Sequence, residues 1–292
     1  MILGAIEAGG TKFVCGIGNE DGEVLERISI PTTTPEETMR LVVDYFKEKK
    51  VDALGVGSFG PVDLDVSSPT YGYITSTPKK HWNQYDLVGK LKNHFHVPIG
   101  FDTDVNAAAL GESLWGAAKS LDSCLYMTVG TGIGVGAVSE GKLVHGMLHP
   151  EMGHILVRRH GDDHFAGRCP FHGDCLEGMA SGPAIEARWG KKGIELASDS
   201  SVWELEAYYL AQALVNYILV LSPKRIVIGG GVMKQEHVYP LVRKWVIQLL
   251  NGYIQHKNVE GHIDTYIVPP VLGDNAGLCG ALALARQAYA NK

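Results

Sequence analysis

A short apolar run, a glycine-rich turn and a second apolar run occur twice in this chain, once at its start and once near its middle. The first copy covers residues 3–17 and turns at 7–12, and the second covers residues 124–138 and turns at 130–136. Two apolar runs separated by a glycine turn are typical of a β-hairpin. The repetition therefore predicts an internal duplication in which one hairpin opens each half of the fold.

Both turns have the composition of a phosphate-binding loop. Glycine lets backbone N–H groups approach a phosphate closely, and in the first turn Thr11 and Lys12 add a hydroxyl and a cation. An ordinary turn with a solvated lysine fits the first motif equally well. A strand follows each turn, whereas a P-loop or a Rossmann fingerprint opens a helix, so neither of those nucleotide-binding motifs is predicted.

Apolar runs alternate with helical patterns in both halves of the chain. Apolar residues at helical spacing follow Thr34 and Pro35, and further helices are predicted at 202–221, at 239–251 and in the alanine-rich end of the chain after residues 273–277. Strands are predicted at 51–58, 97–101, 224–228 and 264–268. This alternation predicts an α/β fold.

Polar or glycine-rich loops follow three of the predicted strands, and ligands bind at such strand ends in open α/β sheets. One loop contains Gly60 and Pro61, one is Asp102-Thr103-Asp104 before a helix, and one is the run 229–232 with three glycines. Asp104 is either the N-cap of the helix that follows or a general base at the mouth of a cleft. The triple-glycine turn either approaches a ligand or is a plain connection.

A set of zinc-ligand residue types lies between residues 151 and 177. Cys169, His172 and Cys175 follow C-x2-H-x2-C spacing, and His154 precedes them. Two thiolates and two imidazoles would complete a tetrahedral shell, which is typical of a structural zinc, because a catalytic zinc keeps one position for water or substrate. The alternatives are a disulfide between the two cysteines or unremarkable histidines. Five scattered cysteines are too few for a secreted disulfide framework.

Composition excludes several classes of protein. The 292 residues, 45% hydrophobic and 20% charged, fit a soluble chain of one large or two medium domains. A net charge of -6 offers no basic face to a phosphodiester backbone, so nucleic acid is not an expected partner. The first residues lack the pattern of a signal peptide, and no apolar run reaches membrane-spanning length. With free cysteines as well, the cytoplasm is the expected location and no membrane partner is expected.

These motifs resemble those of the ROK family (repressors, open reading frames and kinases), and the resemblance covers the whole chain. The motifs are E-A-G-G-T-K, D-T-D-V-N-A-A-A-L-G-E, V-G-T-G-I-G-V-G, E-M-G-H, C-x2-H-x2-C-L-E and G-G-G-V. Within the family, the chain is most similar to bacterial fructokinases. A repressor of this family would need a helix-turn-helix ahead of the first turn, where this sequence has only six residues before Glu7.

The resemblance implies two actin-like (ribonuclease H-like) ATPase domains that flank a central cleft, with a zinc-binding loop. The expected N-terminal domain is 1–118, joined by the closing helix at about 281–292, and the C-terminal domain is 119–280. The implied reaction is phosphoryl transfer from magnesium ATP to the 6-hydroxyl of D-fructose, with mannose or glucose as alternative substrates. A zinc-organised sugar sensor or scaffold is the non-enzyme alternative. A homodimer is expected.

The resemblance also implies a role for each matching residue, with Asp104 as the catalytic base. The implied sugar contacts are Gly60, Pro61, Thr103, Asp104, Glu151, His154 and Glu177. The implied ATP contacts are Glu7, Gly9, Gly10, Thr11, Lys12, Gly130, Thr131, Gly132, Gly134, Pro183, Gly229, Gly230, Gly231 and Val232. The implied ligands of a structural zinc are His154, Cys169, His172 and Cys175, so that the metal would fix the loop that aims the two glutamates.

Three departures from the usual family pattern bear on these roles. Glu7 stands where the family usually has aspartate, which keeps the charge but leaves its relation to magnesium open. The family's glucokinases usually have Glu-Asn-Asp where this chain has Asp102-Thr103-Asp104, so glucose is the less favoured substrate. The zinc spacing also differs from the commoner C-x-C-x4-C, and four ligands remain when His154 is counted.

Overall fold

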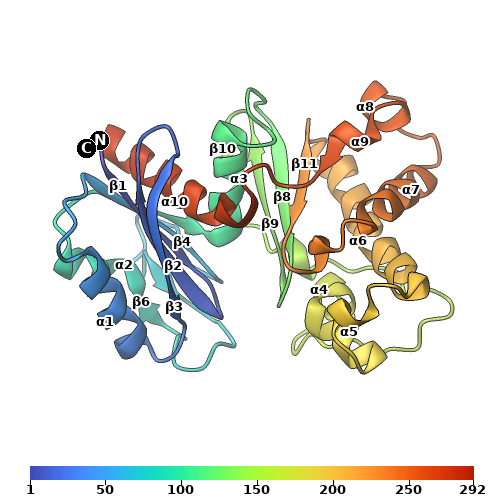
Figure 1. The fold of residues 1–292 in the computed structure, drawn as a ribbon, viewed down its shortest axis with the longest axis horizontal. Coiled ribbons are helices and arrows are strands. Elements are labelled where there is room, and N and C mark those ends of the chain that lie inside the picture. The colour runs from blue at the N-terminus through green and yellow to red at the C-terminus, as the bar shows by residue number, and fades with distance from the viewer.

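The computed structural model describes residues 1–292 and contains two five-stranded sheets with the same topology (Figure 1). The strand order is β3-β2-β1-β4-β7 in the first sheet and β10-β9-β8-β11-β12 in the second. The hairpin strands pair antiparallel in both sheets, and the two strands beyond them pair parallel. Each sheet therefore repeats one chain path, which confirms the predicted duplication.

Each predicted strand is present, although some bounds differ. The first sheet contains β1 (Leu3–Ala8), β2 (Lys12–Gly18), β3 (Val24–Pro31), β4 (Ala53–Ser58) and β7 (Ile99–Thr103). The second contains β8 (Cys124–Val129), β9 (Ile133–Ser139), β10 (Lys142–Leu143), β11 (Ile226–Gly229) and β12 (Ile267–Val268). A small ribbon pairs β5 (Tyr73–Ile74) with β6 (Tyr85–Asp86). The strand predicted at 264–268 was wrong in its first half, because residues 263–266 form a helical turn.

The predicted helices are confirmed, and shorter ones join them. The helices are α1 (Pro35–Phe46), α2 (Leu87–His94), α3 (Asp104–Trp115), α4 (Leu176–Ala180), α5 (Gly182–Trp189), α6 (Ser200–Leu221), α7 (Val238–Leu250), α8 (Lys257–Glu260), α9 (Ile263–Tyr266) and α10 (Ala276–Ala290). Short 3-10 turns lie at 152–154, 193–196, 232–234 and 273–275. None of the helices combines the length and apolar character needed to cross a lipid bilayer.

Helices and sheets alternate in layers along the long axis of the molecule (Figure 1). The apolar faces of α1 and α2 pack on one side of the first sheet, and α10 packs on its other side. The second sheet packs against α3 on one side and against α4–α7 on the other. The two sheets thus face each other across α3 and α10 (Figure 1). The domain boundary between residues 118 and 119 stays a prediction.

Helices α3 and α10 cross at backbone distance because glycine stands at the crossing. A Cβ atom on Gly280 would lie 1.8 Å from the carbonyl oxygen of Ala107. One on Gly55 in β4 would lie 1.8 Å from the carbonyl oxygen of Ala281, on the other side of the same helix. Any side chain at these glycines would push α10 away from α3 or from the first sheet.

Gly280→Ala is therefore expected to lower the free energy of unfolding by roughly 1–3 kcal/mol, because the methyl group must displace backbone atoms and not a flexible side chain. Thermal unfolding followed by circular dichroism measures the effect. Gly161→Ala is the matched control, since a Cβ atom there meets nothing within 4 Å. Equal melting temperatures for the two variants would contradict the expectation.

Glu112 holds together the two segments by which the chain crosses between its halves. It is fully buried in α3, and its carboxylate accepts hydrogen bonds from the backbone N–H groups of Ala117 (2.5 Å), Val271 (3.3 Å) and Leu272 (3.0 Å). Ala117 lies on the crossing that leads from α3 to β8, and the other two lie on the crossing that leads from β12 to α10. Both crossings are thus bound to one side chain.

Candidate active site

A cavity of about 520 Å³ lies between the two sheets. Its walls include Glu7, Lys12 and Arg27 from the first sheet and Tyr126 and Thr128 from the second. Lys234 from the turn after β11, and Asp274 and Gly277 at the start of α10, also line this cavity. A second cavity of about 480 Å³ shares Gly230, Lys234, Gly273 and Asp274 with the first and extends along Tyr239, Arg243, Pro269 and Pro270. Through the shared residues the two cavities form one groove, which is lined by several cations.

The first hairpin places the carboxylate of Glu7 and the cation of Lys12 at this cavity. Burial and the charges of Asp104 and Asp274 raise the pKa of Glu7 to about 7, while Lys12 and Arg27 lower it. A Cβ atom on Gly277 would lie 2.4 Å from the Glu7 carboxyl carbon, so this glycine makes room for the side chain. Gly9, Gly10 and Thr11 form the turn after β1, where Gly9 N–H donates to the Lys12 carbonyl at 3.0 Å. Glu7 and Lys12 line the cavity, whereas Gly9, Gly10 and Thr11 line neither of the two cavities, so the role of the turn at the phosphates stays a prediction.

The second hairpin joins the start of α5 and the triple-glycine turn. Gly182 N–H donates to the Gly130 carbonyl at 2.8 Å, which places Pro183 in the first turn of a helix bound to this hairpin. Gly230, with φ +94°, lies against the backbone of Val129, so the run Gly229, Gly230, Gly231 and Val232 lies beside the Gly130, Thr131 and Gly132 turn. The structure thus brings the predicted nucleotide residues of the second half together.

Gly134 lies outside that turn, because β9 already begins at Ile133 and the turn predicted at 130–136 is shorter. A Cβ atom on Gly134 would lie 2.7 Å from Cγ1 of Val105 in α3. This packing contact explains the glycine without a ligand. Its expected role at the phosphates stays a prediction.

Asp104 is the first residue of α3 and not its N-cap. The cap is Thr103, whose hydroxyl accepts from Asn106 N–H at 3.1 Å, so the N-cap interpretation of Asp104 was wrong. Thr103 is buried, and its hydroxyl oxygen is already engaged in the cap. The Asp104 carboxylate accepts from Val105 N–H at 2.9 Å, and burial raises its pKa to about 6. A carboxylate with such a pKa is a better proton acceptor near neutral pH than an ordinary aspartate.

Asp102 forms a cluster that the sequence did not reveal. Its buried carboxylate accepts from Thr103 N–H at 2.7 Å and from the Asn106 amide at 2.8 Å, and its second oxygen lies 2.8 Å from His145 Nε2. The hydrogen bond to Asp102 raises the pKa of His145. The cluster joins the β7–α3 junction to the loop after β10, so it connects the two halves beside Asp104.

Glu151 lies near both Asp104 and Glu177. Burial, Asp104 and Glu177 raise the pKa of Glu151 to about 7, although its side chain is 48% exposed and solvent screens part of this effect. Glu177 accepts from Ile133 N–H at 3.0 Å, and its other oxygen is 4.0 Å from His154 Nε2. Three carboxylates therefore lie close to one another.

Gly60 and Pro61 form the loop after β4, which approaches the same region. Val62 N–H donates to Nε2 of His149 at 3.0 Å, and a Cβ atom on Gly60 would lie 3.4 Å from the same ring. His149 lies two residues before Glu151. The predicted sugar loop is thus in contact with the segment that carries the predicted sugar carboxylate.

The four predicted zinc ligands form one cluster whose geometry fits a tetrahedral ion. Their ligand atoms all lie within 4.8 Å of one another. Nδ1 of His154 is 3.4 Å from Cys175 Sγ and 3.7 Å from Cys169 Sγ, and Nδ1 of His172 is 3.6 Å from Cys169 Sγ. In a tetrahedral zinc site, a sulfur ligand and a nitrogen ligand at their usual bond lengths are roughly 3.5 Å from each other. Both cysteines are free, which disfavours the disulfide alternative.

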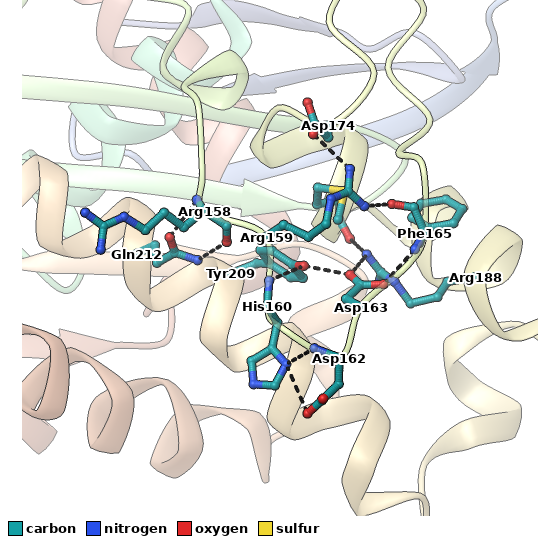
Figure 2. A network of polar contacts seen from close by, with 11 residues as sticks. Arg158, Arg159, His160, Asp162, Asp163, Phe165, Asp174, Arg188, Tyr209 and Gln212 are labelled. Carbon is teal, nitrogen blue, oxygen red and sulfur yellow. Dashed lines mark hydrogen bonds and ion pairs between the residues drawn. The ribbon is translucent and has the colours of Figure 1, made fainter.

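A polar network holds the segment between His154 and Cys169 on α5 and α6 (Figure 2). Asp163 is buried, and its carboxylate accepts from the Tyr209 hydroxyl at 2.6 Å and lies 3.3 Å from Arg188. Burial alone would raise the pKa of Asp163, but the Tyr209 hydroxyl and Arg188 hold it below its usual value. Gln212 binds the backbone of Arg158 at both its N–H and its carbonyl. The segment is therefore fixed by protein contacts that need no metal.

Comparisons with known proteins agree with this arrangement. The model of the ROK family matches residues 3–288. A putative fructokinase of Bacillus subtilis is 57% identical, with 98% of this chain and 96% of the relative covered. A fructokinase of Pediococcus pentosaceus is 48% identical over the full length of both chains.

A solved ROK glucokinase from Streptomyces griseus, in complex with glucose and AMPPNP, superposes with a TM-score of 0.79 at 26% identity, covering 98% of this chain and all of the other. The likeness extends over both sheets and confirms the actin-like two-domain fold. With the family model matched over almost the whole sequence, and with the hairpins, acidic cluster and Cys/His cluster where its motifs predict them, the chain belongs to the ROK family.

Proposed function

We propose that this chain is an ATP-dependent fructokinase, which transfers the terminal phosphoryl group of magnesium ATP to the 6-hydroxyl of D-fructose. The observation that carries the proposal is the position of Asp104, a carboxylate with a raised pKa between the nucleotide groove and a cluster of further carboxylates. The fructokinases that are similar to this chain over their full length support fructose as the acceptor.

Asp104 would accept the proton of the sugar hydroxyl as the oxygen attacks phosphorus. Carboxylates accept hydrogen bonds from hydroxyl groups, so Glu151 and Glu177 would hold other sugar hydroxyls and fix the sugar relative to Asp104. Gly60, Pro61, Thr103 and His154 would be further sugar contacts. Nε2 of His154 is free of the cluster formed by its Nδ1, which lets one ring serve both sites.

ATP would lie in the groove with its phosphates at the two hairpins. Backbone N–H groups of the glycine turns and the Lys12 cation would neutralise the phosphate charge, and the triple-glycine turn with Pro183 would lie toward the nucleoside. Magnesium would enter with ATP as part of the substrate. Glu7 would lie near the magnesium ion. The pKa of this carboxyl is about 7 without the ion, and the charge of the ion would lower it.

The Cys/His cluster would hold zinc through His154, Cys169, His172 and Cys175, with no position left for substrate. Burial, with Cys169 and Glu177, raises the pKa of Cys175 to about 11, so a thiolate there needs a cation beside it. Zinc would supply structural bonds and no chemistry at the sugar. The segment with Glu151 and Glu177 would then be fixed by the metal near both of its ends and by the Asp163 network between them.

The domain boundaries 1–118 and 119–280, a homodimer and a cytoplasmic location are part of the same proposal. The crossing segments at 116–123 and 269–275 support the domain boundaries. The free cysteines support the location, and the resemblance of the motifs supports the dimer. Sedimentation velocity at micromolar concentration tests the dimer.

A coupled assay of ADP formation with fructose, mannose and glucose tests the proposed function. The expected result is ATP consumption that depends on sugar, with the highest kcat/KM for fructose. Turnover that is faster with mannose or glucose would assign the chain to another hexose. The absence of turnover with every hexose would contradict a kinase and favour the sensor or scaffold.

The acid limb of the pH profile is expected near pH 6. Asp104 must be ionised to accept a proton, and its pKa is about 6, so kcat/KM falls as pH drops below that value.

The effect of Asp104 on the stability of the fold has the opposite dependence on pH. Because folding raises this pKa from 3.8, its contribution to stability is present below pH 3.8 and is lost as pH rises through about 6. Far-UV circular dichroism should thus show a folded protein where activity has already fallen. Glu151→Gln is the control, because a limb that moved with this variant would belong to Glu151.

Gly10→Val is expected to raise KM for ATP at least tenfold and to leave KM for fructose unchanged. A Cβ atom at Gly10 meets nothing within 4 Å, so valine fits the fold but fills space proposed for phosphate. Gly161→Val is the matched control, with the same freedom at a turn far from the groove. A change confined to KM for fructose would show that this hairpin does not bind ATP.

A further inference from the structure

His149 connects the two halves of the chain at the sugar end of the cleft. Its ring is 3% exposed and lies between the loop after β4 and Glu151. Nε2 accepts from Val62 N–H at 3.0 Å, and Nδ1 lies 3.5 Å from Oε1 of Glu151. A single imidazole therefore contacts a backbone donor in one half and a carboxylate in the other.

The contact with Val62 determines which ring nitrogen carries the proton. A backbone N–H can only donate, so Nε2 must be the acceptor and the neutral ring holds its hydrogen on Nδ1. Burial lowers the pKa of His149, which favours the neutral ring at neutral pH, although Asp102 and contacts with Pro150 and Val62 act in the other direction. The Nδ1 hydrogen then has the Pro150 carbonyl and the Glu151 carboxylate as its nearby acceptors.

We propose that His149 is a positioning residue for the sugar, which holds Glu151 toward the cleft by donating from Nδ1 while Val62 fixes its tautomer. The inference rests on the proposed function, since it assigns Glu151 to the sugar. Asp104 and Glu177 are charges of the same sign as Glu151, and its side chain is 48% exposed. Without a donor the carboxylate would turn toward water and away from these neighbours.

The arrangement also joins two sugar contacts that lie far apart in the sequence. The loop that contains Gly60 and Pro61 ends at Val62, so a shift of this loop changes the hydrogen bond that orients His149. His149 in turn acts on one oxygen of Glu151 and leaves the other free to accept from a hydroxyl. The orientation of the Glu151 carboxylate thus depends on the position of the loop that contains Gly60 and Pro61.

Three substitutions at this position separate its two contacts. His149→Ala removes both, His149→Asn places an amide donor near the position of Nδ1, and His149→Gln places an amide oxygen near the position of Nε2. His149→Ala is expected to raise KM for fructose roughly tenfold, as for loss of a hydrogen bond to a charged group, with KM for ATP unchanged. His149→Asn should restore most of the fructose affinity, and His149→Gln should restore little. His94→Ala, on the exposed end of α2, is the matched control.

Coupling to Glu151 provides a second measure. In a Glu151→Ala background, His149→Ala should cause no further rise in KM for fructose, because its target is gone. The proposal is overturned if His149→Ala leaves KM for fructose unchanged, if glutamine restores it and asparagine does not, or if the two substitutions add independently. Each of these results would reduce His149 to a packing residue for the loop.

The tautomer can be measured without any substrate, which separates this proposal from the proposed function. In ¹⁵N-histidine spectra of the full chain, His149 should be protonated on Nδ1 only, and Glu151→Gln should shift the Nδ1 signal. A proton on Nε2, or an Nδ1 signal that ignores Glu151→Gln, would overturn the proposal. If the chain phosphorylates another hexose, the KM series uses that sugar. If it phosphorylates none, the proposed function fails and the spectra alone decide on His149.

Discussion

Asp104→Asn is expected to lower kcat roughly 10³-fold while ATP and fructose still bind. Removing a general base costs about 10²- to 10⁴-fold, and asparagine keeps the size of the side chain and its hydrogen bond from Val105. Because Thr103 and not Asp104 caps α3, the substitution leaves the helix start intact. The fold should therefore survive the loss of turnover.

Single-turnover kinetics and fluorescence titration with each substrate measure the two effects separately. Asp44→Asn is the control, since Asp44 lies on the exposed side of α1 and pairs only with Arg40. A variant of Asp104 that kept turnover within a few-fold of the unchanged protein would show that another group takes the proton. Weaker binding with an unchanged chemical step would make Asp104 a sugar ligand only.

Cys175→Ser is expected to release zinc, lower the free energy of unfolding by at least about 4 kcal/mol and raise KM for fructose. Cys175 directly precedes α4, and Glu177 lies in the first turn of that helix. Loss of the metal bond would free the turn that aims this carboxylate. KM for ATP should change little, because the groove lies on other elements.

Cys279→Ser separates this effect from a general loss of stability. Cys279 is also buried, but it lies in α10 and outside the Cys/His cluster. It should lower the melting temperature without loss of zinc or of fructose affinity. Elemental analysis, thermal unfolding and steady-state kinetics on both variants give the comparison. Zinc-depleted protein that stays folded, binds fructose normally and has no turnover would contradict a structural metal.

The parts of the molecule that local patterns determine were predictable from the sequence. The hairpins depend on neighbouring residues, because alternating apolar runs and glycine turns specify a strand pair directly. The cluster of residues 154, 169, 172 and 175 was predictable because metal chemistry restricts both residue type and spacing. Local signals failed at 264–268, where a helical turn occupies a sequence rich in β-branched residues.

The contacts between the halves were not predictable in this way. His145 meets Asp102 across 43 residues, and His149 meets Val62 across 87. No periodicity relates such pairs, since only the folded topology places them together. Gly134 was also not predictable in its packing, because a glycine-rich run suggests a ligand and gives no sign that the side chain of Val105 lies against this glycine.

The single carboxylate of Glu112 has a consequence for how the two halves move. Two bodies that are joined at two separated points can rotate only about the line through those points. Where both connections are bound at one place, that place is the pivot. Glu112 holds residues 117, 271 and 272 at such a place. Asp274 and Gly277 follow Leu272 directly along the chain, so they lie near this pivot. A rotation of the two halves about this point would therefore displace the residues nearest to it, among them Asp274 and Gly277, the least.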